Sequence, residues 1–210
     1  MFSIKICGLT TFDDALAALE AGADYLGFVT YSKSPRGIDA TVLRAICEKL
    51  PAGARTVGVF VNASRAIVET VACDCGLTVV QLHGDELSGA FQGLAWPLWR
   101  AVRLSDGLCR PSPDDWPAER YVVDAAPAGV YGGAGQTADW IAAADFARRH
   151  AMLLAGGLTP ENVAEAVCAV RPAGVDVASG VEASSGRKDR ACVRLFIERA
   201  RAAARKAGLE

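Results

Sequence analysis

Short apolar runs alternate with segments of helical periodicity along the whole chain. Continuous apolar runs of this kind are typical of parallel strands that are buried on both faces of a sheet. The predicted strands are residues 3–6, 25–29, 56–61, 79–82, 98–102, 121–123, 152–155 and 175–177. The predicted helices between them are residues 12–21, 40–49, 64–73, 86–92, 139–149, 160–170 and 188–207.

One interval departs from this alternation. Residues 104–117 contain Pro111, Pro113 and Pro117, which oppose a regular helix, so we expect a loop or one short turn in place of helix 5. Strict alternation of strand and helix favours a parallel sheet, and eight repeats favour its closure. The sequence therefore predicts an α/β fold, a single (β/α)8 TIM barrel domain spanning residues 1–210.

Two glycine turns follow the last two predicted strands. Gly156 and Gly157 come directly after one strand and lead to Thr159-Pro160, where we expect the next helix to begin. The second turn carries Ser179 and Gly180. Glycine has no Cβ, so its N–H can approach an anion closely, and a helix N-terminus adds positive charge. This arrangement predicts a phosphate clamp after strands 7 and 8, and hence a small phosphorylated substrate.

Composition and charge exclude several other classes of protein. The net charge of −2 argues against nucleic-acid binding, which favours a basic surface. No signal peptide or membrane-spanning run is visible, so we expect no membrane partner. The seven cysteines show no framework spacing, which indicates free thiols and a cytoplasmic protein. The sequence leaves both a monomer and a homodimer open.

In a barrel of this kind the chemistry lies at the carboxyl ends of the strands. Cys7 ends the first strand and precedes Gly8, so its thiol can face the pocket. Nearby positive charge would favour the thiolate, which can act as a nucleophile or a general base. Asp124 ends the sixth strand and is either a loop cap or a general acid with a raised pKa.

Three basic side chains also occupy predicted positions at this mouth. Arg36 follows Ser34-Pro35, and its guanidinium suits a substrate carboxylate. His83 either shapes its loop through a hydrogen bond or takes part in catalysis. Arg103 either balances ligand charge or pairs with an acidic loop residue.

Two further motifs carry no site. The pair Cys73 and Cys75 lacks zinc-site spacing and has no second pair. The glycine-rich segment 132–135 lacks the GxGxxG spacing of a dinucleotide fingerprint.

Eight motifs, in this order along the chain, resemble those of the phosphoribosylanthranilate isomerase family of tryptophan biosynthesis. The resemblance covers residues 5–189. The motifs are Lys5-Ile6-Cys7-Gly8-Leu9-Thr10, Gly22-Ala23-Asp24-Tyr25-Leu26-Gly27-Phe28, Ser34-Pro35-Arg36, Val57-Gly58-Val59-Phe60-Val61-Asn62, Val80-Gln81-Leu82-His83-Gly84-Asp85-Glu86, Gly132-Gly133-Ala134-Gly135-Gln136-Thr137-Ala138-Asp139-Trp140, Leu154-Ala155-Gly156-Gly157-Leu158-Thr159-Pro160-Glu161-Asn162-Val163 and Val175-Asp176-Val177-Ala178-Ser179-Gly180-Val181-Glu182.

The resemblance implies a (β/α)8 barrel that uses no metal and no organic cofactor. It implies an Amadori rearrangement of N-(5-phosphoribosyl)anthranilate to 1-(2-carboxyphenylamino)-1-deoxyribulose 5-phosphate. In this assignment Cys7 is the general base, Asp124 is the general acid and Arg36 binds the anthranilate carboxylate. The other predicted substrate-binding residues are His83, Arg103, Gly156, Gly157, Asp176, Ser179 and Gly180.

Other functions remain as alternatives. The related aminoaldose isomerase of histidine biosynthesis resembles this pattern but has aspartate where Cys7 stands. Indole-glycerol-phosphate synthase chemistry needs a lysine at a strand end, and the sequence offers none there. A phosphoribosyl-ligand-binding barrel that is non-catalytic or has a shifted substrate is the third alternative. Segments 30–33 and 125–130, and Ala138, depart from the family pattern and bear on substrate fit and loop closure.

Overall fold

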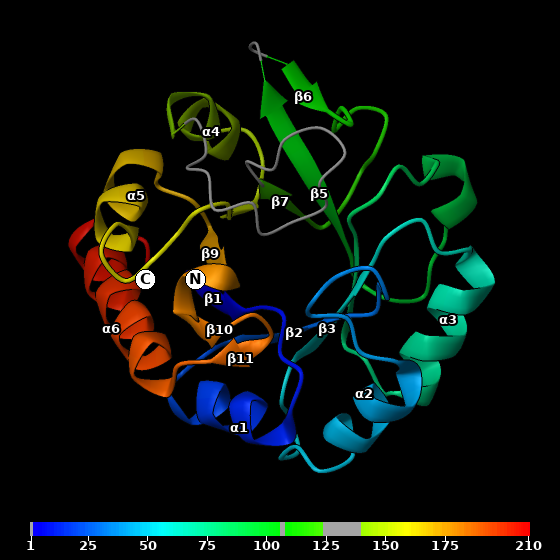
Figure 1. The fold of residues 1–210 in the computed structure, drawn as a ribbon. Coiled ribbons are helices and arrows are strands. Elements are labelled where there is room, and N and C mark those ends of the chain that lie inside the picture. Colours follow the sequence, from blue (N-terminus) through cyan, green and yellow to red (C-terminus); the bar gives the residue numbers. More distant parts are fainter. Residues whose placement is uncertain (1, 106–107, 124–139) are drawn as a thin grey trace.

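The computed structural model describes residues 2–105, 108–123 and 140–210. Eight parallel strands form a closed barrel at its centre, and helices surround it (Figure 1). The barrel strands are β1 (Ser3–Ile6), β2 (Tyr25–Val29), β3 (Thr56–Phe60), β4 (Val79–Leu82), β5 (Leu98–Ser105), β7 (Arg120–Val123), β8 (Met152–Leu154) and β9 (Gly174–Val177). β1 pairs with both β2 and β9, and pairing of β4 with β5 closes the ring.

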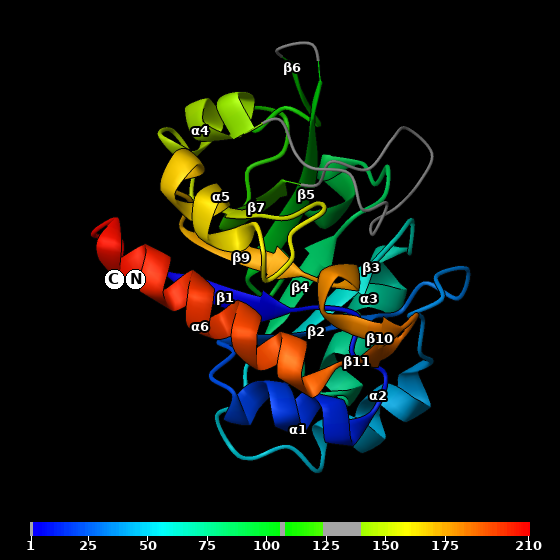
Figure 2. The ribbon, with the colours of Figure 1, turned by 60° about the vertical axis from the view of Figure 1, so that its left-hand side comes forward.

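The outer layer is helical. Its helices are α1 (Phe12–Glu20), α2 (Ala40–Cys47), α3 (Arg65–Asp74), α4 (Trp140–Ala147), α5 (Val163–Val170) and α6 (Arg190–Lys206). Side-chain oxygens of Thr11, Asp39, Ser64 and Asp189 accept backbone N–H groups at four helix N-termini, as N-caps do. The longest helix, α6, lies between α1 and α5 (Figure 2).

Alternation along the strands divides the apolar side chains into two clusters. One set points outward and packs against the helices, as Phe28 and Leu82 do. The other fills the base of the barrel interior and includes Tyr25 and Trp99, whose rings meet edge to face at 4.7 Å. Because successive strand residues face opposite sides, the interior positions nearer the carboxyl ends are left for polar groups.

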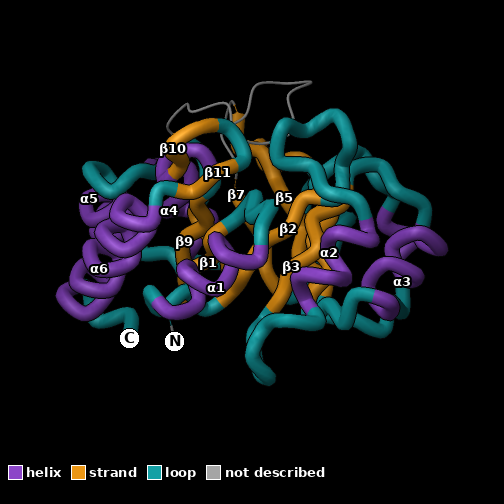
Figure 3. Tube along the Cα trace, turned by 60° about the horizontal axis from the view of Figure 1, so that its bottom comes forward, coloured by secondary structure: helices purple, strands orange, loops and turns teal. Residues whose placement is uncertain are grey.

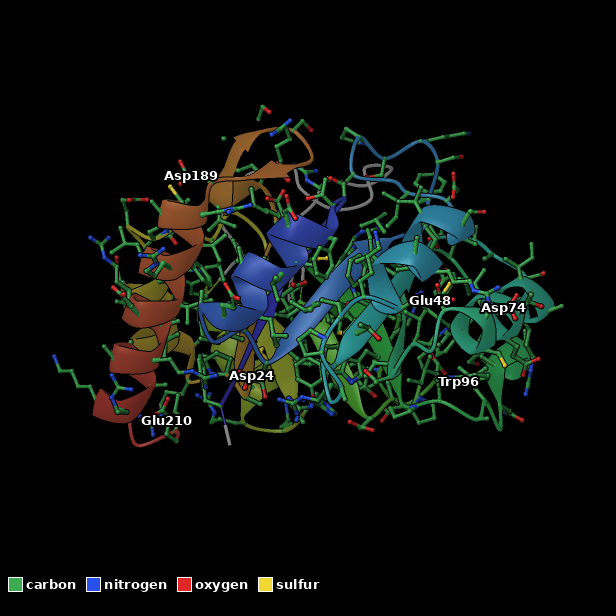
Figure 4. The ribbon with its side chains drawn as sticks, turned by 90° about the horizontal axis from the view of Figure 1, so that it is seen from below. Asp24, Glu48, Asp74, Trp96, Asp189 and Glu210 are labelled. Atoms are coloured by element: carbon green, nitrogen blue, oxygen red, sulfur yellow. The ribbon has the colours of Figure 1, made fainter. Side chains whose placement is uncertain are left out.

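Ion pairs join the C-terminal segment to the base of the barrel. Figure 4 shows Asp189 and Glu210 at opposite ends of α6, with Asp24 near the Glu210 end. At this base Arg201 contacts Asp24 at 2.5 Å and the Glu210 carboxylate at 3.8 Å. Figure 3 places the chain termini at this end and the hairpin of β10 (Glu182–Ser184) and β11 (Arg187–Lys188) at the other, which is the mouth.

The predicted (β/α)8 barrel is confirmed, and all eight predicted strands are present. In place of helix 5, the described part of 104–117 contains a hairpin, which was not predicted, and then the expected loop with a short turn at residues 111–117. β5 runs on to Ser105 and pairs antiparallel with β6 (Leu108–Arg110). In the sequence, the Asp106-Gly107 dipeptide between them is a strong hairpin signal, and the prolines that follow oppose a helix but not this hairpin.

The helix predicted over residues 86–92 was also wrong. Only one 3₁₀ turn, η1 (Ser88–Phe91), forms there. Its predicted first residue, Glu86, turns inward and is 8% exposed. Its carboxylate accepts the backbone N–H groups of Asn62 and Gly84. Glu86 therefore stabilises the loops at the barrel mouth and does not begin a helix.

Two elements near the predicted clamp differ from expectation. α5 begins at Val163, so Pro160 precedes the helix and does not occupy its first turn. The Asn162 side chain accepts the N–H of Thr159 and donates to the carbonyl of Gly157, which holds residues 157–162 as a turn. After β9 the chain forms the 3₁₀ turn η2 (Ser179–Val181) and the β10–β11 hairpin before α6, and this hairpin was not predicted.

Candidate active site

A pocket opens at the carboxyl ends of the strands, with about 730 Å³ of empty space that includes the part open to solvent. Seven of the sequence-predicted site residues line it: Cys7, Arg36, His83, Gly156, Gly157, Asp176 and Ser179. Apolar side chains, among them Val29, Val59 and Leu158, form the rest of the wall. The pocket combines an apolar lining with a few convergent polar groups.

Cys7 lies at the bottom of this pocket and is 8% exposed. Burial raises the pKa of its thiol above the ordinary value, while the positive charges of Lys5 and Lys188 act against that rise. Nearby positive charge was expected to favour the thiolate, and Lys5 and Lys188 act in that direction. The charges are present, but desolvation of the sulfur outweighs them.

Lys5 is fully buried inside the barrel, one interior position below Cys7 on β1. Its Nζ lies 3.0 Å from each carboxylate oxygen of Asp176 on β9. Burial alone would lower the pKa of Lys5, but the charges of Asp176 and Cys7 raise it, so the ammonium form persists. The predicted substrate-binding residue Asp176 is thus committed to an internal ion pair.

Arg36 approaches the pocket from the loop after β2, where its guanidinium forms a two-point ion pair. Its Nε donates to Glu182 Oε1 at 2.7 Å, and its Nη2 donates to Oε2 at 2.8 Å. Lys188 Nζ donates to the same Oε1 at 3.0 Å and to the carbonyl of Ala178 at 2.9 Å. The Arg36 side chain is therefore fixed by β10 and β11, and only its outer edge remains for a ligand.

Gly8 allows Arg36 to reach this position. It has φ +71°, and a Cβ on it would lie 2.5 Å from Cδ of Arg36. The aliphatic part of Arg36 therefore passes directly over the backbone next to Cys7. A side chain at this position would displace Arg36 and strain the backbone at the same time.

The two glycine turns meet at the side of the pocket. Gly156 and Gly157 have φ of 81° and 64°, the left-handed conformation that favours glycine. Gly180 packs so closely that a Cβ on it would lie 1.8 Å from the carbonyl oxygen of Leu158. Within the described residues, no acceptor takes the backbone N–H groups of Gly156, Gly157 or Ser179, so these donors are available to an anion.

A buried ion pair supports the opposite side of the mouth. Glu86 and Arg100 are each 2% exposed at their side chains and lie 2.7 Å apart. Glu86 also accepts the backbone N–H groups of Asn62 and Gly84, and Arg100 donates to the Gly84 carbonyl at 2.6 Å. The ends of β3, β4 and β5 are thereby tied together, and they carry the loop that begins at His83.

His83 and Arg103 occupy different parts of the mouth. His83 Nδ1 lies 3.2 Å from Gln81 Nε2 and faces the main pocket. Arg103 lines a neighbouring hollow, which it shares with His83. The structure therefore places Arg103 beside the main pocket, and its predicted substrate contact stays a prediction.

Asp124 lies outside the described residues, as do segments 125–130 and 132–135 and Ala138. Sequence reasoning missed four charged side chains of the site, namely Lys5, Glu182, Lys188 and Glu86. Lys5 carried a usable signal, because it is a charged residue at an interior position of a buried strand. The other three lie in loops or in the unpredicted hairpin. Among the described residues, no group of three or more potential metal ligands gathers.

Comparison with known proteins identifies the family. The profile of N-(5′-phosphoribosyl)anthranilate isomerase matches residues 4–199. A relative from Trichlorobacter lovleyi, an N-(5′-phosphoribosyl)anthranilate isomerase, is 45% identical over 97% of this chain and 100% of its own length. The chain belongs to the N-(5′-phosphoribosyl)anthranilate isomerase family.

Solved structures of the isomerase family agree in fold. The phosphoribosylanthranilate isomerase of Thermotoga maritima superposes with a TM-score of 0.84 at 38% identity, covering 96% of this chain and 100% of that one. Another structure is of a phosphoribosyl anthranilate isomerase in complex with reduced 1-(o-carboxyphenylamino)-1-deoxyribulose 5-phosphate. It superposes with a TM-score of 0.80 at 35% identity over 96% of this chain and 100% of that one. Across the described residues, no helix has the length and apolar character needed to cross a membrane.

Proposed function

We propose that this protein catalyses the isomerisation of N-(5-phosphoribosyl)anthranilate in tryptophan biosynthesis. One observation carries the proposal. A single pocket brings together the thiol of Cys7, the guanidinium of Arg36 and the unused N–H groups of Gly156 and Gly157. These are the groups that a substrate with an acidic C–H, a carboxylate and a phosphate requires, and membership of the family supports the assignment.

Substrate binding divides between two ends of the pocket. The phosphate accepts N–H groups from Gly156, Gly157 and Ser179, with Gly180 holding the second turn against the first. The anthranilate carboxylate accepts from the outer edge of Arg36, since Glu182 occupies the other edge. This places the sugar between the two ends, above Cys7.

The reaction begins with ring opening. Asp124 gives its proton to the furanose oxygen as the bond from that oxygen to C1 breaks. The nitrogen lone pair then forms a double bond to C1, which leaves a protonated Schiff base. The role of Asp124 rests on its position directly after β7 in the sequence and on the family pattern. A positioned acid of this kind contributes about 10²–10⁴-fold to the rate.

Cys7 then removes the proton from C2. The C2–H electrons form a C1–C2 double bond, and the C1–N π electrons return to nitrogen, giving an enolamine. Tautomerisation moves the hydroxyl proton to C1 and leaves the ketone at C2. Cys7 now carries one proton more and Asp124 one fewer, and exchange with solvent restores both.

Cys7 as base and Asp124 as acid are the only reagents that this scheme uses. The proposed partner is the small phosphorylated substrate, and the chain acts as a monomer or a homodimer. All seven cysteines are free thiols, which fits a reducing compartment, and we therefore place the protein in the cytoplasm.

A fluorescence assay tests the function. Anthranilate and phosphoribosyl pyrophosphate are joined in situ by the preceding enzyme of the pathway, and the fluorescence of the substrate is then followed. Added protein should cause a rapid fall and yield the ketose product by mass spectrometry. Tight binding with no loss of substrate would instead identify a non-catalytic phosphoribosyl-ligand-binding barrel.

A further inference from the structure

The barrel interior below the pocket contains a buried charged group for which the reaction scheme gives no role. Lys5 is 0% exposed, and its ion-pair partner Asp176 is 7% exposed. Burying such a pair gains little stability over an apolar pair of the same volume. Its position directly beneath Cys7 points to a part in the chemistry of that thiol.

The hydrogen-bonding geometry leaves Lys5 one donor to spare. An ammonium group has three N–H donors. Two of them are directed at Oδ1 and Oδ2 of Asp176, each at 3.0 Å. The third has no acceptor among the hydrogen bonds of the described residues, and the positive charge of the ammonium acts on the nearby Cys7 sulfur.

Gly27 on the neighbouring strand β2 shows how close the two side chains are. A Cβ on Gly27 would lie 2.9 Å from Sγ of Cys7 and 2.9 Å from Cε of Lys5. The sulfur and Cε are therefore within about 5.8 Å of each other. The side chain of any larger residue at position 27 would enter the space between Lys5 and Cys7.

We propose that Lys5 is a positioning residue for Cys7: anchored by both oxygens of Asp176, its ammonium stabilises the thiolate form of Cys7, which accepts the substrate C2 proton, against the cost of burying that charge. Asp176 in turn keeps Lys5 charged and directed. This inference rests on the proposed isomerase function for its kinetic consequence, but not for its consequence in the free protein.

Other charges around Cys7 act in the same or the opposite sense. Lys188 on β11 adds positive charge, and Asp176 on β9 adds negative charge. Arg36, in the loop after β2, is also close enough for its positive charge to attract a Cys7 thiolate. Of these charges, that of Lys5 has the largest effect in favour of the Cys7 thiolate, ahead of that of Lys188.

Alkylation of the free protein tests the proposal without substrate. Iodoacetamide reacts with thiolate, so at a pH below the Cys7 pKa its rate with Cys7 reports the thiolate fraction. The Cys7 peptide is quantified by mass spectrometry, and exposed Cys73 serves as the internal reference. Lys5→Met should lower the Cys7 rate at least tenfold at pH 7.5, because one unit of pKa changes that fraction about tenfold.

Three further variants make the result specific. Lys5→Arg keeps a positive charge and should retain more of the rate than Lys5→Met. Lys5→Met/Asp176→Asn leaves no unpaired carboxylate, folds more securely, and should still lower the rate. Lys49→Met removes an exposed positive charge and should leave the rate unchanged.

The kinetic arm uses the same proteins in the isomerase assay. For Lys5→Met, kcat should fall by a factor similar to the fall in alkylation rate, with KM changed less than about threefold, since the substrate does not contact Lys5. A Cys7 alkylation rate within about twofold of the wild type in folded Lys5→Met or in the double variant would overturn the proposal. Absence of turnover in the wild type would contradict the isomerase function instead and leave the alkylation result standing.

Discussion

The Glu182→Gln substitution tests how Arg36 is held. The structure gives Glu182 three charge-assisted hydrogen bonds: two from Arg36, at 2.7 and 2.8 Å, and one from Lys188 at 3.0 Å. Glutamine has the same shape but only one acceptor oxygen. If the glutamine oxygen accepts from Arg36 Nε and Lys188, the glutamine NH₂ group faces Arg36 Nη2. Two donors then face each other, and that hydrogen bond is lost.

The magnitude follows from these contacts. One hydrogen bond is lost, at about 1.5–3 kcal/mol for a bond to a charged group, and the other two are weakened because their acceptor becomes neutral while their donors stay charged. The side chains of Arg36 and Glu182 are only 13% and 5% exposed, so solvent screens little of this. We expect the free energy of unfolding to fall by about 3 kcal/mol. KM should rise about tenfold as Arg36 loses its orientation, since a tenfold change in affinity is about 1.4 kcal/mol.

Equilibrium urea unfolding and steady-state kinetics measure the two quantities. Glu48→Gln is the matched control, because its pair with Arg44 is about 60% exposed on both sides and should contribute less than about 0.5 kcal/mol. An unfolding free energy within 1 kcal/mol of the wild type would refute the stability estimate (about 3 kcal/mol). A KM that falls in Glu182→Gln would show that Glu182 competes with the substrate for Arg36 and does not position it.

Three further predictions concern the clamp, the mouth and pH. Gly180→Ala should weaken inorganic phosphate and substrate binding at least tenfold by isothermal titration, because its Cβ would lie 1.8 Å from the Leu158 carbonyl oxygen and force the two turns apart. Glu86→Ala should lower the free energy of unfolding by about 4 kcal/mol in urea, since it leaves buried Arg100 unpaired; a loss below 1 kcal/mol would argue against this ion pair. Burial alone would raise the pKa of Glu182, but Arg36 and Lys188 hold it below its ordinary 4.5. Its contribution is therefore complete above pH 4.5 and is lost as pH falls through the lower folded value, so the stability difference between the wild type and Glu182→Gln should shrink at pH 3 and stay constant from pH 6 to 8.

The strands and the site were predicted from the sequence to different degrees. Buried parallel strands show as apolar runs, so all eight were found, and the alternation fixed the barrel. Strand ends converge on one mouth, which is why Cys7, Arg36 and Gly156 could be placed together in advance. Helix predictions from local sequence failed where a side chain binds the backbone outside the predicted helix. Glu86 accepts the N–H of Asn62 where a helix was predicted, and Asn162 donates to the carbonyl of Gly157 just before α5.

The charge network of the site was beyond sequence reasoning for a similar reason. Arg36 and Glu182 are 146 positions apart, and Lys5 and Asp176 are 171 apart. No periodicity relates such pairs, and only barrel closure through the pairing of β1 with β9 brings the second pair into contact. The pKa of Cys7 was beyond prediction for the same reason, because burial of the sulfur cannot be weighed against nearby charges before the packing is known.

We propose that Cys7 and Asp124 supply the base and the acid of one isomerisation. The most direct measurement is kcat for the wild type, Cys7→Ala and Asp124→Asn in the same fluorescence assay, with binding of the product analogue as the control for folding and affinity. We expect rapid turnover by the wild type, a fall in kcat of at least about 10²-fold in each variant, and nearly unchanged binding of the analogue. Turnover by either variant within threefold of the wild type would contradict this proposal.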